Sequence, residues 1–328
     1  MTMANVLRPW RAPERYPVLE DYEGWLASSP VRGGRRLKGT SSDTEPLPKV
    51  SVVTAVLNAR SALATTLQSV QSQEGVALEH IIVDGGSTDG TVELLEQQGD
   101  RIEAWVSEPD RGIYDAINKG IALSRGTFIN VIHAGDTYCH ARVLADALSV
   151  CQDSSADVVY GDYLWLQPDW DVCLHIKVAL DLSREPPCHP AMLIARRSHE
   201  RLGLYRLDLS LAADHELALR FWLGGARFVH FAHPMAVYLA GGVSDQQALR
   251  IWGEASVMLL QHLGPRALAR YPLLQWYHLA ARGLAYVGGL CLGRTRRNRL
   301  FGVYFLTRER LTGGVRTVVP PPRIVAGH

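Results

Sequence analysis

The sequence predicts an α/β fold with a mainly parallel, doubly wound central sheet flanked by helices. Three observations predict this fold. Apolar runs of strand length alternate with helical patterns from Val50 onward, carboxylates follow three of those runs, and 47% hydrophobic with 20% charged residues is an ordinary globular composition. Ligands of such sheets bind at the carboxyl ends of the strands, so the sequence also predicts where the functional site lies.

Four strand–helix repeats make up the first part of this pattern. The expected strands are Val50–Val56, Ile81–Asp84, Ala104–Ser107 and Phe128–Ile132. Between them, apolar residues recur at helical spacing, as in the series Ile113, Ile117 and Ile121, which ends before Gly126. The acids Asp84, Glu108 and Asp136 all fall at the ends of expected strands.

The repeats divide the 328 residues into three parts. Residues 1–48 are expected to form an irregular arm with one short helix near Leu19–Leu26, because they mix Arg, Pro, Gly and Ser without periodicity. Residues 49–245 form the predicted domain, with a nucleotide-binding half (49–137) and an acceptor half (138–245). Residues 246–328 are expected to form a helical extension.

Charge and cysteine usage exclude several classes of protein. The net charge of +1 gives no overall field for binding nucleic acid, and five widely spaced cysteines do not resemble a disulfide framework or a zinc site. The N-terminus lacks the apolar run of a signal peptide, which predicts a cytoplasmic protein. His278 and Arg282 interrupt the apolar stretch 273–292, which favours a helix lying on a membrane surface over one that spans it.

The turn after the second expected strand is the first candidate site. Its sequence, DGGSTDGT from Asp84, has glycines that let the backbone approach a ligand and polar residues that cap the next helix. A tight turn with a good cap explains the glycines without any ligand. It does not explain the acid that ends the strand, so Asp84 is a candidate contact for a nucleotide base.

The loop after the fourth expected strand is the second candidate site. Asp136 offers a hard oxygen ligand for Mg²⁺ or Mn²⁺, and one protein carboxylate suffices when substrate phosphates supply other ligands. A helix cap is the alternative for Asp136. His189 is a second candidate ligand, with a buried, hydrogen-bonded histidine as its alternative.

Two helical segments carry the remaining candidates. Lys119 is spaced four residues from Asp115, which favours a surface ion pair, and its competing role is contact with a donor phosphate. Asp214 stands at the start of an expected helix, where a carboxylate caps the helix or faces a ligand.

Together these segments resemble family 2 glycosyltransferases with the GT-A fold, which has a Rossmann-like sheet, over roughly residues 49–244. The resemblance rests on six motifs in order: VSVVTAVLNARSALATTLQSVQSQ, HIIVDGGSTDGT, VSEPDRGIYDAINKGI, HAGDTY, CHPAMLIARRSHERLGLYR and LAADHELALRF. They are most similar to the subgroup that builds bacterial surface polysaccharides.

The resemblance implies inverting transfer from a UDP-, GDP- or dTDP-sugar to a glycan or polyprenyl-linked acceptor, at the inner face of the plasma membrane. Asp136, with Gly135 beside it, would hold Mg²⁺ or Mn²⁺ under the diphosphate, and Asp214 would be the general base. The nucleotide would contact the first strand and the turn after the second, through Thr54, Asn58, Asp84, Gly86 and Ser87.

Two departures from the family pattern leave alternatives open. The metal loop reads HAGD, with one acid where members often have two, and Ala213 precedes Asp214 where many have glutamate, so Glu216 is a reserve base. A binding or scaffold protein without turnover is the second reading. A nucleotidyltransferase is a third, but it would need a glycine-rich loop where this chain has Leu57–Arg60.

Overall fold

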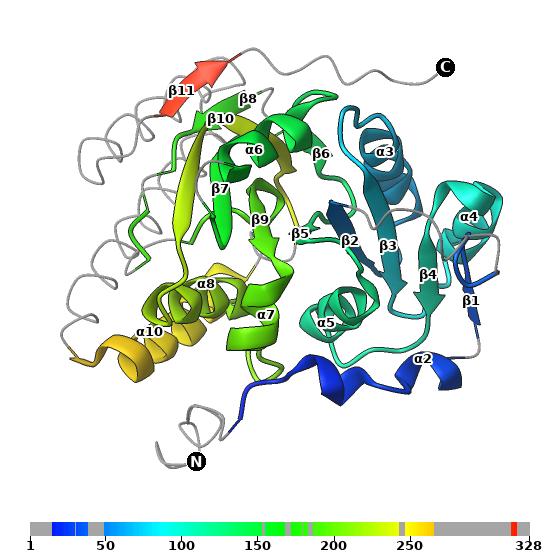
Figure 1. Ribbon diagram of the computed structural model, residues 1–328, viewed down its shortest axis with the longest axis horizontal. Coiled ribbons are helices and arrows are strands. Elements are labelled where there is room, and N and C mark those ends of the chain that lie inside the picture. The colour runs from blue at the N-terminus through cyan, green and yellow to red at the C-terminus, as the bar shows by residue number, and fades with distance from the viewer. Residues whose placement is uncertain are drawn as a thin grey trace, which may run out of the picture.

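The computed structural model describes residues 15–29, 31–38, 49–152, 155–167, 172–178, 180–182, 186–242, 247–265 and 316–319. These residues form an α/β fold around one sheet of eleven strands, with helices on both faces (Figure 1). The strand order is β1-β4-β3-β2-β5-β9-β7-β10-β6, with β8 paired to β7 and β11 paired to β8. The α/β class predicted from the sequence is confirmed.

The first part of the sheet is parallel, as its alternating pattern predicts. It contains β2 (Val50–Val56), β3 (Leu78–Asp84), β4 (Ala104–Ser107) and β5 (Phe128–Val131). Strand β2 pairs in parallel with β3 and β5, and β3 pairs in parallel with β4. All seven residues of β2 are buried, as expected of a strand covered by helices on both faces.

In the part of the chain that the structure describes, two α-helices cover one face of this parallel part, and one α-helix covers the other face. On one face lie α3 (Arg60–Gln71) and α4 (Thr91–Gln98), followed by the short η3 (Gly99–Arg101), and on the other lies α5 (Ile113–Leu123) (Figure 1). A Cβ atom on Gly120 of α5 would lie 2.3 Å from Val53 Cγ1 of β2. Helix α5 therefore packs on the sheet at a distance that leaves no room for a methyl group.

The second part of the sheet is mixed, so the expectation of a mainly parallel sheet holds only for the first part. Strand β9 is antiparallel to both of its neighbours, β5 and β7, and β7 is parallel to β10. The strands are β6 (Thr137–Tyr138), β7 (Val158–Gln167), β8 (Val172–Ile176), β9 (Met192–Ala195), β10 (Phe228–Leu239) and β11 (Arg316–Val319). The helices of this part are α6 (Val143–Gln152), η5 (His189–Ala191), α7 (Arg196–Leu202), α8 (Ala213–Leu223) and α10 (Ala248–Leu263).

The N-terminal arm has more regular structure than the sequence predicts. The short helices η2 (Leu19–Tyr22) and α2 (Trp25–Ser28) occupy the region where one helix was expected. Strand β1 (Val31–Gly33), which was not expected, pairs antiparallel with the edge of β4. Three residues are too short a run to show strand periodicity, so β1 could not be expected from the sequence.

Helix α10 is the part of the expected C-terminal extension that packs on α8. Its residues Ala255, Met258 and Leu259 are buried in one cluster with Ala218 and Leu219 of α8. The apolar stretch 273–292, for which an interfacial helix was expected, lies outside the described residues. Within the described ranges, no helix combines the length and apolar character that a membrane crossing requires. The division into domains at residues 48 and 245 stays a prediction.

Candidate functional site

The carboxyl end of β3 carries a turn that is organised by Asp84. The Asp84 carboxylate is fully buried, and its Oδ2 atom accepts hydrogen bonds from the backbone of Gly86 (3.1 Å) and Ser87 (2.9 Å) and from the Ser107 hydroxyl (2.6 Å). The Ser87 hydroxyl donates to its Oδ1 atom. The protein itself therefore supplies the donors for both oxygens of Asp84.

Asn58 and Ser87 join the loops that follow β2 and β3. The Asn58 backbone donates to the Ser87 hydroxyl (2.7 Å), and the Asn58 side chain accepts from the Thr88 backbone (2.8 Å). Asn58 and Gly86 both have positive φ angles, +49° and +86°, which Asn and Gly adopt most readily. The two loops thus form one rigid edge at the carboxyl ends of the parallel strands.

Two predicted nucleotide contacts are not available in this arrangement. Thr54 is completely buried and its hydroxyl hydrogen-bonds the His80 ring (3.0 Å), so no surface of Thr54 faces a base. Lys119 is 6% exposed, and its ammonium lies 2.5 Å from Glu108 and 3.6 Å from Asp115. Two carboxylates already neutralise Lys119, so it is not a phosphate ligand, and its pair with Asp115 is buried rather than on the surface.

Glu108 instead connects the N-terminal arm to this edge of the sheet. It accepts hydrogen bonds from the Trp25 indole and the Ser29 hydroxyl of the arm as well as from Lys119. These donors lower the pKa of Glu108, although its burial alone would raise it. Glu108 therefore has a structural role and is not a free ligand.

Asp136 differs from Asp84 in having an oxygen without a partner. Its Oδ1 atom accepts from the Leu239 backbone (3.0 Å), whereas its Oδ2 atom is buried without any hydrogen bond. Burial raises the pKa of Asp136 to about 7. Gly135, beside it, has a φ of +102°, and Leu239 packs over it, since a Cβ on Gly135 would lie 3.1 Å from Leu239 Cδ2.

Two histidines lie close to the Asp136 loop. His133 belongs to that loop, and its ring centroid is 5.7 Å from that of His189. Burial lowers the pKa of His133 to about 4 and also lowers the pKa of His189. His133 Nδ1 and His189 Nε2 have no hydrogen-bond partner, so the alternative of a hydrogen-bonded His189 does not account for its Nε2 atom. Both rings are neutral at neutral pH, as metal-binding histidines must be.

Asp214 lies in the first turn of α8 and is partly exposed. Its Oδ1 atom accepts from the backbone of His215 (2.8 Å) and lies 3.4 Å from the Tyr114 hydroxyl. Its negative charge opposes the lowering of the pKa in both His133 and His189. Ring contacts connect Asp214 to the two histidines: the Tyr114 ring stacks on Tyr205, and the centroid of the Tyr205 ring lies 5.3 Å from that of the His189 ring.

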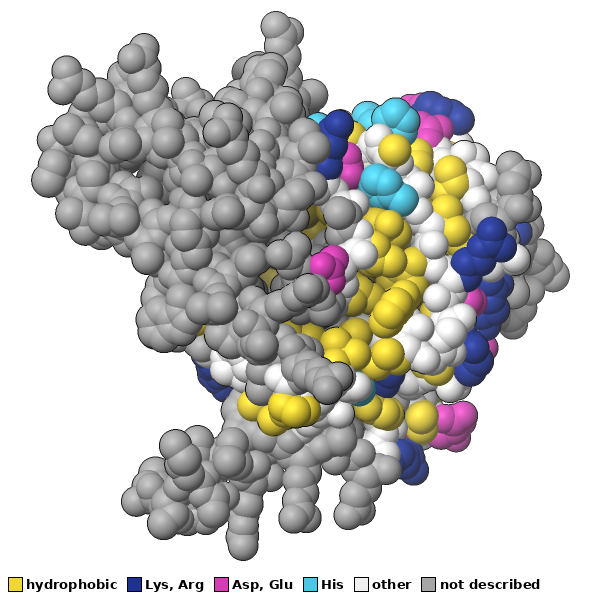
Figure 2. Space-filling model, turned by 90° about the vertical axis from the view of Figure 1, so that its left-hand side faces the viewer, with side chains coloured by type: hydrophobic (Ala, Val, Ile, Leu, Met, Phe, Trp, Pro, Cys, Tyr) yellow, Lys and Arg dark blue, Asp and Glu magenta, His cyan; other side chains and the backbone are white. Residues whose placement is uncertain are grey.

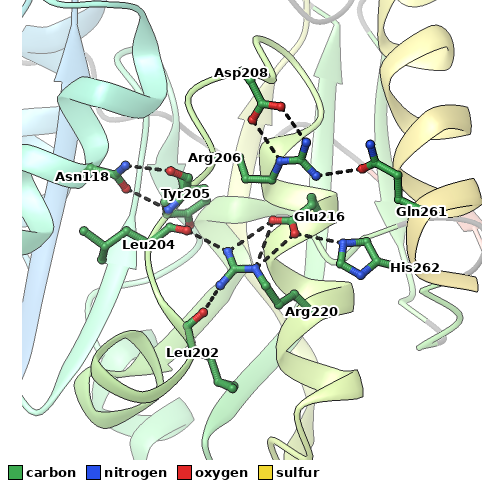
Figure 3. A network of polar contacts seen from close by, with 10 residues as sticks. All are labelled: Asn118, Leu202, Leu204, Tyr205, Arg206, Asp208, Glu216, Arg220, Gln261 and His262. Carbon is green, nitrogen blue, oxygen red and sulfur yellow. Dashed lines mark hydrogen bonds and ion pairs between the residues drawn. The ribbon is translucent and has the colours of Figure 1, made fainter. Parts of the chain in front are cut away.

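Glu216, the reserve base, lies in the core instead of in this site. It is fully buried, and its carboxylate pairs with Arg220 and His262, each at 3.1 Å (Figure 3). Burial favours a raised pKa, but the His262 hydrogen bond and the Arg220 charge lower the pKa of Glu216 below its ordinary value. A fully buried carboxylate whose oxygens are paired with Arg220 and His262 cannot reach a substrate, so Glu216 is a structural residue.

Comparison with known proteins gives this site its context. The family model for glycosyl transferase family 2 matches residues 51–194. An uncharacterized glycosyltransferase of Mycobacterium tuberculosis is 31% identical over 188 residues, which cover 53% of this chain and 68% of the relative. The chain belongs to glycosyltransferase family 2. A second relative of this glycosyltransferase, the PGL/p-HBAD biosynthesis glycosyltransferase of Mycobacterium bovis, is 28% identical, with 57% and 74% of the two chains covered.

Solved structures show the same fold at low sequence identity. The mannosyltransferase PcManGT of Pyrobaculum calidifontis, solved with GDP-Man and Mn²⁺, has a TM-score of 0.53 at 19% identity, covering 90% of this chain and 94% of its own. S. aureus TarS, solved with UDP-GlcNAc, has a TM-score of 0.55 at 15% identity, covering 70% and 73%. The fold of this glycosyltransferase is therefore that of GT-A enzymes.

The glycosyltransferase site also contains residues that the sequence analysis did not single out. Tyr114 stacks on Tyr205 with ring centroids 5.5 Å apart, and its hydroxyl is next to Asp214. Asn118 of the same helix makes paired hydrogen bonds with the Tyr205 backbone, at 2.8 and 2.9 Å. Spacing along α5 identifies its buried face, but only the folded chain shows that this face meets residue 205.

The protein supplies few ligands for a divalent cation at this site. Among the residues described, no three His, Cys, Asp or Glu side chains are arranged to hold a metal ion. The unpartnered Oδ2 atom of Asp136 is nevertheless the kind of hard oxygen that Mg²⁺ and Mn²⁺ bind, with phosphates and water completing their shells. The residues present therefore fit a cation that arrives with a diphosphate.

Proposed function

We propose that this glycosyltransferase is an inverting enzyme that uses a nucleotide-diphosphate sugar. The acceptor would be a hydroxyl of a glycan or of a polyprenyl-linked glycan in cell-surface polysaccharide synthesis, reached from the cytoplasmic side. The names of its relatives, in PGL/p-HBAD and O-antigen biosynthesis, support this substrate class. UDP-, GDP- and dTDP-sugars are the donors to test first.

One observation carries the proposal: the partly exposed carboxylate of Asp214 is linked through the packed rings of Tyr114, Tyr205 and His189 to the loop in which Asp136 has an oxygen without a partner. Asp214 accepts the proton of the acceptor hydroxyl while the acceptor oxygen bonds to the anomeric carbon. The bond from that carbon to the diphosphate breaks on the opposite face, and the nucleoside diphosphate leaves with its electron pair. Attack opposite the leaving group inverts the anomeric configuration.

The residues around the two acids would hold the donor and the cation. Asp136 would bind Mg²⁺ or Mn²⁺, with His189 as a second ligand, and the cation would offset the charge of the departing diphosphate. The edge made by Asn58, Gly86 and Ser87 would receive the nucleotide through its backbone and polar atoms. Asp136 is 3% exposed, so the end of β10 at Leu239 must move aside when donor and cation enter.

The test is an assay of nucleoside diphosphate release with Mn²⁺ or Mg²⁺ and a panel of sugar nucleotides, in wild type and Asp214→Asn. We expect release with at least one donor in wild type and a loss of roughly 10²- to 10⁴-fold in Asp214→Asn, because the general base is removed. Asp146→Asn, a change at a surface carboxylate of α6, is the matched control and should keep wild-type activity.

Two results would contradict the proposal. Full activity of Asp214→Asn would exclude Asp214 as the base. Tight binding of a sugar nucleotide by wild type, without release of diphosphate under any condition or acceptor, would favour the reading of a binding or scaffold protein. Determination of the product's anomeric configuration then tests inversion directly.

A further inference from the structure

The turn before α8 is held by a carboxylate from a distant part of the chain. Glu254 of α10 is 3% exposed, and its Oε2 atom accepts from three successive backbone N–H groups, those of Ser210 (3.0 Å), Leu211 (2.8 Å) and Ala212 (3.1 Å). Its Oε1 atom accepts from the Ser210 hydroxyl at 2.6 Å. Successive N–H groups that converge in this way form an anion-binding nest, and here the protein fills the nest with its own side chain.

The nest ends two residues before Asp214. Ala212 is the N-cap of α8, and α8 begins at Ala213, so any shift of the turn 210–212 shifts the first turn of the helix. No side chain of the turn itself caps the helix, since Ala212 makes no side-chain hydrogen bond. Glu254, from another helix, holds the start of α8 in place, as a capping side chain next to the helix otherwise would.

Helix α10 makes two further polar contacts around the same segment. Gln261 accepts from Arg206 at 2.9 Å before the turn, and His262 contacts Glu216 at 3.1 Å after it (Figure 3). The apolar packing of Met258 and Leu259 against Leu219 brings the two helices together. Helix α10 thus contacts the chain both before and after Asp214.

We propose that Glu254 is a positioning residue for the reaction and acts through Asp214, so that α10 is a functional part of the catalytic unit. The inference rests on the proposed role of Asp214 as base. Proton transfer requires Asp214 and the acceptor oxygen to lie within hydrogen-bond reach, and a displacement of about 1 Å can cost roughly 10²-fold in rate. Fixing the turn therefore affects the chemical step rather than donor binding.

The variants to compare are Glu254→Leu, which removes the acceptor, and Glu254→Gln. The glutamine oxygen can fill the nest while its amide donates to the Ser210 hydroxyl, so Glu254→Gln should keep the geometry and most of the activity. In Glu254→Leu we expect kcat to fall roughly 10- to 100-fold with the donor KM unchanged. Amide hydrogen exchange at Leu211 and Ala212 should become faster only in Glu254→Leu.

Ile102→Ala is the matched control for loss of stability. It removes a buried side chain just before β4, in a cluster that contains no residue of α8 or α10, so it should lower the unfolding temperature and leave kcat unchanged in the folded protein. If Glu254→Leu does not fold, Glu254→Asp, which withdraws the carboxylate by one methylene, should show a smaller loss of kcat in the same direction.

The double variant Asp214→Asn with Glu254→Leu decides whether Glu254 acts through Asp214. If it does, the double variant is no slower than Asp214→Asn alone, because a misplaced base costs nothing once the base is gone. Losses that multiply, or wild-type kcat in Glu254→Leu with an inactive Asp214→Asn, would overturn the inference alone. Full activity of Asp214→Asn would remove the base and the inference together.

Discussion

Two carboxylates at the ends of parallel strands, Asp84 after β3 and Asp136 after β5, have opposite surroundings. The protein supplies donors to both oxygens of Asp84, from the turn 86–87 and from Ser107, whereas Asp136 receives one hydrogen bond and keeps a buried oxygen without any. Because leaving a buried polar atom unpaired costs free energy, such an atom needs a reason. The comparison supports the proposal that Asp84 holds its turn in place whereas Asp136 binds a ligand.

The largest expected effect is on activity. Asp136→Asn should lower transfer by about 10³-fold, because the amide lacks the charge that binds the cation under the diphosphate. Asp84→Asn should lower transfer less than about 10-fold in the folded protein, since the amide oxygen still accepts the backbone donors. Steady-state assays of both variants over a range of Mn²⁺ concentrations measure the difference. Equal losses in the two variants would remove the contrast between the two acids.

Loss of the Asp84 carboxylate should lower the stability of the protein more than loss of the Asp136 carboxylate does. Asp84→Ala leaves two backbone N–H groups and two hydroxyls without their acceptor, and we expect the free energy of unfolding to fall by about 3 kcal/mol. Urea unfolding measures this change. The exposed carboxylate of Asp146 provides the control, because Asp146→Ala should change the free energy by less than about 0.5 kcal/mol. A similar, small change in both variants would show that Asp84 has no structural role.

The pH dependence of stability should separate Asp136 from other groups. Burial raises the pKa of folded Asp136 to about 7 from 3.8, so between these values the folded state binds more protons than the unfolded state and loses stability as pH rises. Asp136→Asn lacks this loss. Without metal, it should therefore be more stable than wild type at pH 8 by about 4 kcal/mol, and about equal to wild type at pH 4.

Thermal unfolding of both proteins from pH 4 to 8 tests this expectation. His80 and His133, whose pKa values burial lowers to about 3 and about 4, destabilise both proteins in acid and cancel in the difference. Mn²⁺ added together with a nucleoside diphosphate should stabilise wild type at pH 8 more than Asp136→Asn, because a ligand stabilises only the state that binds it. A constant difference across the pH range would mean that Asp136 ionises normally in the folded protein.

Local patterns in the sequence were enough to predict the parallel half of the fold. The bounds of β2 and β4 coincide with the expected strands, because each is a short apolar run between polar turns. The order of the second half could not be predicted, since β9 lies between β5 and β7 only through contacts between distant segments. The three-residue β1 has no pattern of its own and exists because β4 offers an edge.

The sequence predicts the place of a candidate residue where it follows a strand or begins a helix. Asp136 follows β5 and Asp214 lies in the first turn of α8, and their roles in the reaction stay proposals. Thr54, Lys119 and Glu216 had suitable chemistry and neighbours in the sequence, but burial and ion-pair partners, which only the fold determines, exclude them from the site. The role of Glu254 could not be predicted either, because 40 or more residues separate it in the sequence from the N–H groups that it binds.

The surface that faces left in Figure 1 differs from the edge formed by the loops after β2 and β3. Figure 2 shows hydrophobic side chains gathered in the middle of that face, with histidines near its upper rim. Strand β10, in which His230 and Ala232 are exposed, changes register against β7 between Phe231 and Ala236. Strand β10, which bears Leu239, is thus irregular in its pairing, which is consistent with the movement proposed for donor entry.

The three residues of β1 have a practical consequence for anyone who shortens this protein. They cover the outer hydrogen-bonding side of β4, which would otherwise be the free margin of a sheet whose β4 residues are all buried. Removing residues 1–33 would leave that margin as a template for strands of other molecules. A truncated enzyme should therefore self-associate and precipitate, even though every acid discussed above would still be present.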